Sequence, residues 1–88
     1  MRDRIWGAPD LVIEVLSPGT RRRDSRDKRR WYRQYGVREY WIIDPILQMI
    51  EVIPFCAPRA RGRVFRGLQP VASHVLPAFA VPAKEFFK

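Results

Sequence analysis

Two charged side chains stand where the sequence pattern predicts the interior of the protein. The first, Glu14, lies in the run from Asp10 to Leu16, in which five of the seven residues are aliphatic. Such a run is typical of a strand that is buried on both faces. A carboxylate placed there persists only when it is paired, hydrogen-bonded or bound to a metal ion. The chemistry open to Glu14 is therefore ion pairing or metal ligation.

The second is Lys28, which lies in a predicted helix. It precedes Trp31, Tyr32 and Tyr35 by three, four and seven residues, so helical spacing places it on the inward, aromatic face. Because the helix directly follows the strand of Glu14, we expect the acid and the lysine to approach each other. A buried acid facing a lysine suggests a phosphodiester-cleaving site, and a purely structural ion pair is the equally supported alternative.

The remaining charged candidates are Asp10 and three consecutive arginines. Asp10 shares the strand face of Glu14 by parity, but four residues of strand span about 13 Å, whereas carboxylate ligands lie within about 2.6 Å of a metal ion. We interpret Asp10 as a turn or edge residue, with metal ligation as the second alternative. Arg21, Arg22 and Arg23 precede the predicted helix and are candidates for contacts with phosphates, which bind at helix starts. A solvated arginine loop is the alternative.

The elements that must position these residues follow an α/β order. Residues 1–9 are interpreted as an irregular lead-in, and residues 54–62 as a loop. The side chains that could stack on bases are assigned to the core because of their spacing, and they are Trp31, Tyr32, Tyr40 and Trp41. The predicted elements are a strand over 10–16, a helix from Asp24 as N-cap to Tyr35 with Gly36 as its stop, strands over 38–43, 49–53 and 63–66, and a short helix from Pro82 with Phe86 and Phe87 packing back.

The charge balance indicates an acidic partner. Seventeen Lys and Arg residues face nine acids, which gives a net charge of +8, and eight of the seventeen lie between Arg21 and Arg33. Fourteen of the seventeen are arginine, the residue suited to bidentate contact with phosphate. This composition is compatible with nucleic acid, an acidic membrane surface or an acidic protein partner, and we favour nucleic acid.

The length and the cysteine count exclude several classes of protein. Eighty-eight residues make one small domain, and the single Cys56 excludes a disulfide framework or a four-cysteine zinc site within one chain. The only histidine, His74, has no second ligand at metal-binding spacing and is interpreted as structural. No apolar run approaches a membrane span of about 18 residues, and no signal-peptide core follows the charged start. A cytoplasmic protein is expected.

Several motifs together resemble one family. They are Gly7–Thr20, Asp24, Lys28, Tyr32, Gly36-Val37, Glu39–Trp41 and Asp44-Pro45, with further likeness through Ile50–Val52 and from Leu76 to Phe87. On these residues the chain resembles the Uma-type restriction endonuclease family, which has the PD-(D/E)xK nuclease fold. The resemblance covers nearly the whole chain.

The resemblance implies a metal-dependent nuclease site. In families of this fold, two acids on neighbouring strands hold Mg²⁺ (or Mn²⁺), and a lysine activates or orients the attacking water. Carried over to this sequence, Glu14 takes the second acid position. The lysine expected two residues later is absent, because position 16 is Leu, and Lys28 on the following helix supplies it.

The resemblance also implies that this chain lacks the N-terminal part of the family domain. Members of the family are usually about twice as long, and their first metal-binding acid lies on an upstream strand. We therefore expect residues 1–88 to be a truncated domain, the C-terminal part of a restriction-endonuclease-like core, with weak Mg²⁺ binding and an exposed sheet edge. A homodimer could supply an acid in trans.

On this resemblance we interpret the chain as a fragment of a Mg²⁺-dependent DNA endonuclease domain, with little or no activity by itself. Two alternatives stay open. One is a non-catalytic, basic nucleic-acid-binding module, and the other is a degenerate nuclease remnant in which Glu14 and Lys28 form only an ion pair.

Overall fold

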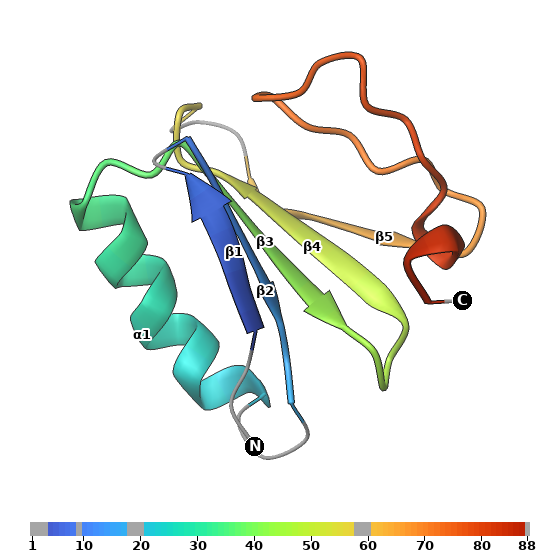
Figure 1. The fold of residues 1–88 in the computed structure, drawn as a ribbon, viewed down its shortest axis with the longest axis horizontal. Helices are drawn as coiled ribbons and strands as arrows, with labels where there is room; N and C mark the ends of the chain where they lie inside the picture. Colours follow the sequence, from blue (N-terminus) through green and yellow to red (C-terminus); the bar gives the residue numbers. More distant parts are fainter. Residues whose placement is uncertain (1–3, 9, 18–20, 58–60, 88) are drawn as a thin grey trace.

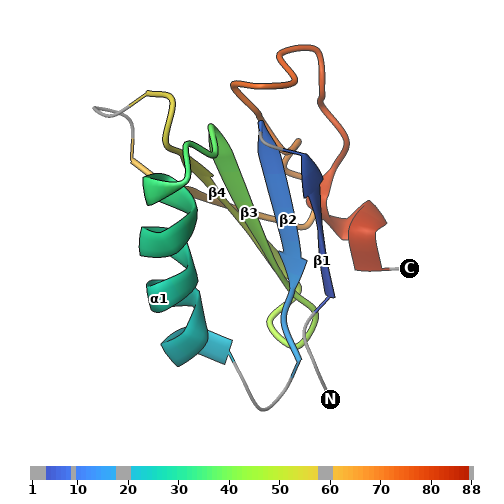
Figure 2. The ribbon, with the colours of Figure 1, turned by 60° about the vertical axis from the view of Figure 1, so that its left-hand side comes forward.

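The protein folds as one mixed sheet between two covering layers. The computed structural model describes residues 4–8, 10–17, 21–57 and 61–87, with only the backbone described for 4–8 and 21–26. The helix covers one face of the sheet, and the C-terminal segment covers the other (Figures 1 and 2). The elements are β1 (Arg4–Ala8), β2 (Leu11–Val15), α1 (Arg21–Gln34), β3 (Glu39–Asp44), β4 (Met49–Pro54), β5 (Arg63–Arg66) and the 3-10 helix η1 (Ala83–Phe87).

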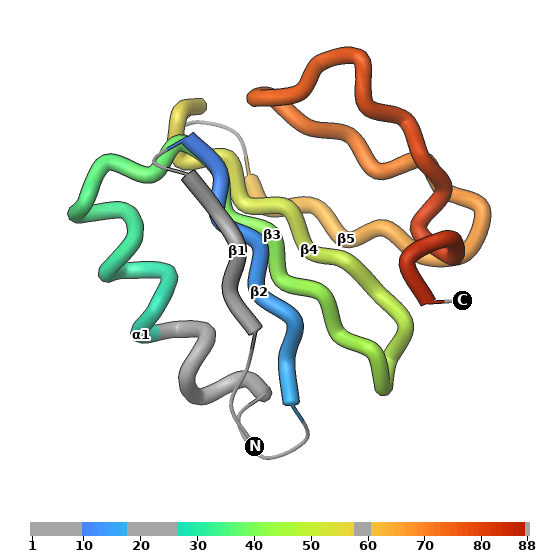
Figure 3. Tube along the Cα trace, in the orientation of Figure 1, coloured from blue at the N-terminus to red at the C-terminus, as the bar shows by residue number. Residues whose placement is uncertain are grey.

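The strand order in the sheet follows the chain, β1-β2-β3-β4-β5. The β2–β3 pair is parallel and the other three pairs are antiparallel. Parallel neighbours need a long crossover, and α1 supplies it. The last three strands then form an antiparallel meander (Figure 3). This topology confirms the predicted α/β class.

Two apolar clusters lie on the two faces of the sheet. All six residues of the central strand β3 are buried, because this strand contributes to both clusters. The cluster beneath α1 comprises Val12, Leu16, Tyr32, Val37, Tyr40, Ile42 and Ile53. The cluster beneath the C-terminal segment comprises Trp41, Ile43, Ile50, Val52, Phe65, Val71 and Ala83.

The prediction for residues 1–9 is wrong, because Arg4–Ala8 form a strand. This strand pairs antiparallel with β2, and Ile5 lies opposite Glu14. A five-residue segment that contains a glycine carries little local strand signal, and its conformation is set by pairing with β2. The exposed edge predicted beside the Glu14 strand is therefore covered, and the edges of the sheet are β1 and β5.

The predicted start of the helix also needs correction. The helix begins at Arg21 rather than Asp24, so Asp24 is not its N-cap. Arg21, Arg22 and Arg23 form the first turn of the helix instead of preceding it. Arginine is a good helix former, which allows the run to extend the helix toward the N-terminus. The predicted stop is confirmed, since Gly36 lies two residues past the helix with φ at +80°.

The helix buries a narrower stripe than its pattern predicts. Tyr32 is buried, but Trp31 is 53% and Tyr35 72% exposed, although all three were assigned to the inward face. A single helix on a sheet presents only one stripe to it, along positions i and i+4, and this stripe contains Lys28 and Tyr32. The core assignments on β3 are confirmed.

A second buried acid fastens the C-terminal segment to the sheet. Glu39 is fully buried on the sheet face away from α1. Its carboxylate accepts hydrogen bonds from Trp41 Nε1 at 2.7 Å, from the His74 backbone N–H at 2.8 Å, and from the Ser73 hydroxyl. The aromatic side chains that follow in the segment, Phe79, Phe86 and Phe87, then pack on the same cluster, as predicted for the last two.

Gly36 offers a test of the helix stop. A Cβ added there would meet no heavy atom within 4 Å, so a substitution probes backbone conformation alone. Gly36→Ala is expected to lower the free energy of unfolding by about 1 kcal/mol, because alanine disfavours a positive φ. Gly36→Asn should cost less, since asparagine tolerates this region. Urea denaturation measures both, and wild-type stability of the alanine variant would contradict the assignment.

Candidate functional site

Glu14 lies at the centre of the best candidate site. It occupies the middle of β2, between Ile5 on β1 and Ile42 on β3, and its side chain is fully buried. Its strand neighbours Val12 and Leu16 belong to the cluster beneath α1, so Glu14 also faces the helix. An ionised carboxylate in this position requires compensation from other groups.

The structure brings Lys28 to this carboxylate. The Nζ of Lys28 forms an ion pair with Oε2 of Glu14, and the lysine side chain keeps 28% of its surface exposed. The approach expected from helical spacing is thus observed. The pair extends from the buried middle of the strand to the margin of the helix, where the lysine meets solvent.

Tyr40 binds the other oxygen of the carboxylate. Its hydroxyl donates to Oε1 of Glu14 at 2.5 Å, and its ring lies 5.0 Å from the ring of Tyr32, edge to face. Burial raises the pKa of the Tyr40 phenol far above its ordinary value, and the hydrogen bond to Glu14 raises it further. Tyr40 therefore remains a donor at neutral pH, and Glu14 is held at both oxygens.

A second ion pair lies in the same row of the sheet. Glu51 on β4 is opposite Ile42, which is opposite Glu14, and its Oε2 lies 3.2 Å from Arg29 Nη2. Glu14 and Glu51 are separated by two strand spacings, which correspond to about 10 Å between their backbones. Consecutive helix residues thus engage two acids on neighbouring parts of the sheet.

The other predicted metal ligand, Asp10, lies apart from this pair. It is exposed, in the turn before β2, and four residues of strand separate it from Glu14. The structure therefore does not bring the two carboxylates together, and the interpretation of Asp10 as a turn residue is confirmed.

The three predicted phosphate-contacting arginines are placed only by their backbone. Arg21, Arg22 and Arg23 lie in the first turn of α1, whereas the sequence placed them in a loop before the helix. Their side chains lie outside the described part of the structure. Contact of these side chains with phosphate stays a prediction.

The sequence interpretation missed the roles of Tyr40 and of the Arg29–Glu51 pair. Tyr40 was assigned to the core, and a buried tyrosine hydroxyl usually has a hydrogen-bond partner. This rule predicts that the Tyr40 hydroxyl has a hydrogen-bond partner, but it does not identify the partner. The partner depends on the parallel register of β2 and β3, in which Val12 lies opposite Tyr40.

The described residues supply only part of a metal site. Among them, no group of three His, Cys, Asp or Glu residues could hold a metal ion. Glu14 offers one carboxylate, and Glu51 lies too far away to share an ion with it directly. Mg²⁺ is often held by one or two carboxylates together with substrate phosphates and water, so Glu14 would hold such an ion only with ligands from elsewhere.

Comparison with known proteins decides the family. The sequence profile of the Uma2 family, described as "Putative restriction endonuclease", matches residues 2–83. The chain belongs to the Uma2 family. This confirms the resemblance found on Gly7–Thr20 and the motifs that follow it.

A solved structure supports the same fold for this Uma2 chain. The chain is similar to the crystal structure of a "putative nuclease belonging to DUF820" from Anabaena variabilis ATCC 29413, with a TM-score of 0.73 and 26% sequence identity. The match covers 91% of this chain and 44% of the other, so the Uma2 chain spans less than half the length of that relative. No match was found among the curated proteins. Within the described residues, no helix is long and apolar enough to span a membrane.

The ion pair predicts strong coupling between Glu14 and Lys28. Lys28→Met leaves a buried carboxylate without its cation and is expected to lower the free energy of unfolding by about 3–5 kcal/mol. The double variant Glu14→Gln/Lys28→Met should be less destabilised than the sum of the two single variants. Chemical denaturation of all four proteins gives the coupling energy.

Lys84→Met is the matched control. Lys84 is an exposed lysine in η1, so its loss is expected to change stability by no more than about 0.5 kcal/mol. Additive effects of the Glu14 and Lys28 substitutions would show that the pair contributes nothing beyond its separate side chains.

The raised pKa values of Tyr40 and Tyr32 predict instability in alkali. Burial is the main cause of both shifts. In the unfolded chain a tyrosine loses its proton near its ordinary pKa of 10.0, whereas the folded protein keeps these protons to higher pH. The unfolded state then binds fewer protons, so the free energy of unfolding falls above about pH 10, by about 1.4 kcal/mol per pH unit for each tyrosine.

Tyr40→Phe tests this linkage. The variant is expected to be less stable at neutral pH by about 1–3 kcal/mol, because it loses a hydrogen bond to a charged group. Above about pH 10 its stability should fall less steeply with pH, because one fewer proton is released on unfolding. Denaturation curves at a series of pH values measure both effects. Equal slopes in the two proteins would contradict the assigned role of Tyr40.

Proposed function

We propose that this Uma2 chain carries the Glu14–Lys28 part of a nuclease site that hydrolyses phosphodiester bonds in nucleic acid, with DNA as the favoured substrate. The observation that carries the proposal is the fully buried carboxylate paired with a partly exposed lysine, in a chain whose family is described as "Putative restriction endonuclease". In such a pair the carboxylate holds a cation that keeps 28% of its side chain exposed, beside solvent from which a phosphate can approach.

In this proposal each side chain has a separate role. Lys28 stabilises the negative charge that develops on the phosphorus oxygens, because a preorganised cation is worth more than a mobile one. Glu14 orients Lys28 and acts as a metal ligand, and Tyr40 fixes the carboxylate. A bound Mg²⁺ or Mn²⁺ would supply Lewis-acid activation of the phosphate and of a water molecule.

Charge supports nucleic acid as the substrate. The net charge of +8 attracts a polyanion over long range. The compartment that we propose for the protein is the cytoplasm. We assign contacts with the phosphate backbone to Arg21, Arg22 and Arg23, in the first turn of α1. The helix N-terminus there adds a partial positive charge.

The activity of the isolated chain is proposed to be low. The described residues offer one carboxylate at the site, and the chain spans 44% of the length of its solved relative. A second acid would come from a longer form of the protein or from a partner copy in a homodimer.

A plasmid-nicking assay tests the proposal. Purified chain at high concentration is incubated with supercoiled DNA, with and without Mg²⁺ or Mn²⁺. Slow nicking that requires the metal is expected, because Glu14 is a ligand and Lys28 stabilises charge. Glu14→Gln and Lys28→Ala should each lower the rate by at least about a hundredfold, whereas Lys84→Ala, at an exposed lysine on the other face, should retain it.

A non-catalytic nucleic-acid-binding module is the second candidate function. It is favoured by the observation that both oxygens of Glu14 are already engaged. If this candidate is correct, the folded wild-type chain binds DNA with a steep salt dependence, Glu14→Gln binds equally well, and no metal-dependent nicking occurs. A folded chain that neither cleaves nor binds DNA would indicate a degenerate nuclease remnant.

A further inference from the structure

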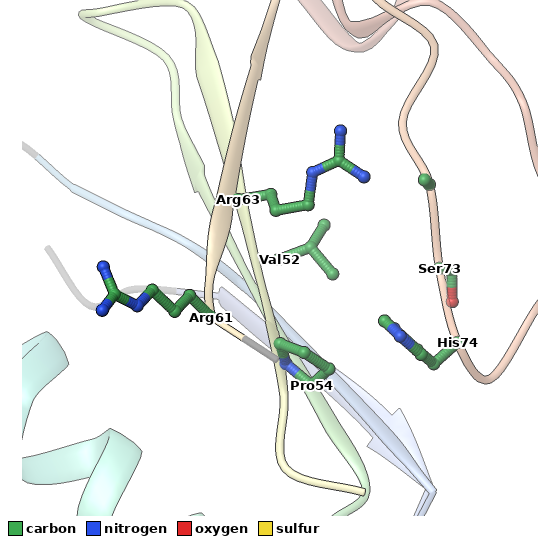
Figure 4. Close-up of a pocket in the computed structure, with 7 residues that line it drawn as sticks. Val52, Pro54, Arg61, Arg63, Ser73 and His74 are labelled. Atoms are coloured by element: carbon green, nitrogen blue, oxygen red, sulfur yellow. The ribbon is translucent and has the colours of Figure 1, made fainter. Parts of the chain in front are cut away.

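A pocket of about 560 Å³ lies on the sheet face opposite Glu14. It is bounded by β4 and β5 on one side and by the segment that Glu39 holds on the other (Figure 4). Its lining includes Val52, Pro54, Arg61, Arg63, Ser73 and His74. Because the sheet separates it from the Glu14–Lys28 pair, it is a distinct site that the proposed nuclease chemistry does not use.

Arg63 forms the cationic wall of this pocket. It lies opposite Val52 in the sheet, and its guanidinium carbon lies 5.3 Å from the centre of the Phe65 ring. The side chain extends from β5 toward the segment of Ser73 and His74 (Figure 4). A guanidinium near the face of an aromatic ring is attracted to that ring, and it presents planar donors that suit phosphate or carboxylate.

The opposite wall is fixed by the core. Glu39 accepts hydrogen bonds from the Ser73 hydroxyl and from the His74 backbone N–H, and the same hydroxyl accepts from the N–H groups of Val75 and Leu76. The Ser73 hydroxyl is therefore engaged in hydrogen bonds that hold this wall together. The half-exposed imidazole of His74 has Nδ1 at 3.8 Å from Glu39 Oε1, and it faces the pocket from this wall (Figure 4).

The floor of the pocket is apolar. Val52 and Pro54, both on β4, contribute apolar lining from the sheet, and Ala72 adds to it from the segment of Ser73. An inorganic anion alone would leave this surface uncovered, whereas a flat organic ring would bury it. The volume lies within the usual range for small-molecule sites, about 300–1,000 Å³.

We infer that this pocket binds a small planar organic anion of the kind that a 5′-mononucleotide presents, with the ring on Val52 and Pro54 and the phosphate at Arg63. Arg61 also contributes to the lining, but its side chain extends away from Arg63 and His74 (Figure 4), so Arg63 is the cation assigned to the phosphate. The carboxylate of Glu39 behind the opposite wall is engaged by donors of the protein, which reduces its repulsion of a bound anion.

Titration with dTMP, followed by NMR, tests this inference on the intact chain. The sequence contains one histidine, so the imidazole signals of His74 are unambiguous reporters. Saturable shifts of the His74 and Ala72 signals are expected. Thymidine and inorganic phosphate, which each carry one half of the ligand, should bind at least about tenfold more weakly. A 5′-phosphorylated oligothymidine distinguishes a free nucleotide from a strand end.

Arg63→Gln is the decisive variant, and Arg30→Gln is its matched control. Both remove one exposed arginine, but Arg30 lies on α1, across the sheet from the pocket. Arg63→Gln should weaken dTMP binding by at least about tenfold, and Arg30→Gln should leave it within about twofold. The His74 and tryptophan spectra report whether each variant is folded.

Three results would overturn the inference. His74 signals that do not move with millimolar dTMP would exclude the site. Equal weakening by the two arginine substitutions would show general electrostatic attraction instead. Binding of inorganic phosphate as tight as that of dTMP would exclude a role for the apolar floor.

Discussion

The rest of the structure depends on the burial of one carboxyl group. Glu14 is fully enclosed in the second strand of the sheet, and an unpaired charge there would cost several kcal/mol. The fold is therefore confined to arrangements that bring compensating groups to it. Lys28 from the helix and Tyr40 from the parallel strand meet this requirement, and together they fix the rotation of α1 and the register of β2 against β3.

The opposite face of the sheet follows the same principle with a different acid. Glu39 is also fully buried, and its hydrogen bonds hold Ser73 and His74 against the sheet. Side chains alternate between the two faces along β3, so Tyr40 packs in the cluster beneath α1 and Trp41 in the cluster beneath the C-terminal segment. Each buried acid thus joins one covering layer to the central strands. Its hydrogen bonds and ion pairs fix the orientation of that layer more narrowly than apolar contacts would.

This division of the molecule bears on function. The helix face carries the Glu14–Lys28 pair, to which we assign the proposed nuclease role on the basis of membership of the Uma2 family. The ion pair and the hydrogen bond of Glu14 engage both of its oxygens, so the proposed metal ligation would compete with the contacts that hold this carboxylate. The match covers 44% of the solved relative's chain, and the proposed nuclease activity would require further metal ligands beyond Glu14.

Local pattern by itself determined the α/β order of elements, the strand at 63–66 and the inward direction of Lys28, because side-chain periodicity and turn residues act over a few positions. The remaining features were decided only by the tertiary structure. The strand Arg4–Ala8 exists through its pairing with β2, and the exposure of Trp31 depends on how α1 lies on the sheet. The bond from Tyr40 to Glu14 joins residues 26 positions apart. Such contacts depend on strand register and helix rotation, which the packing of the whole chain sets and no short segment specifies.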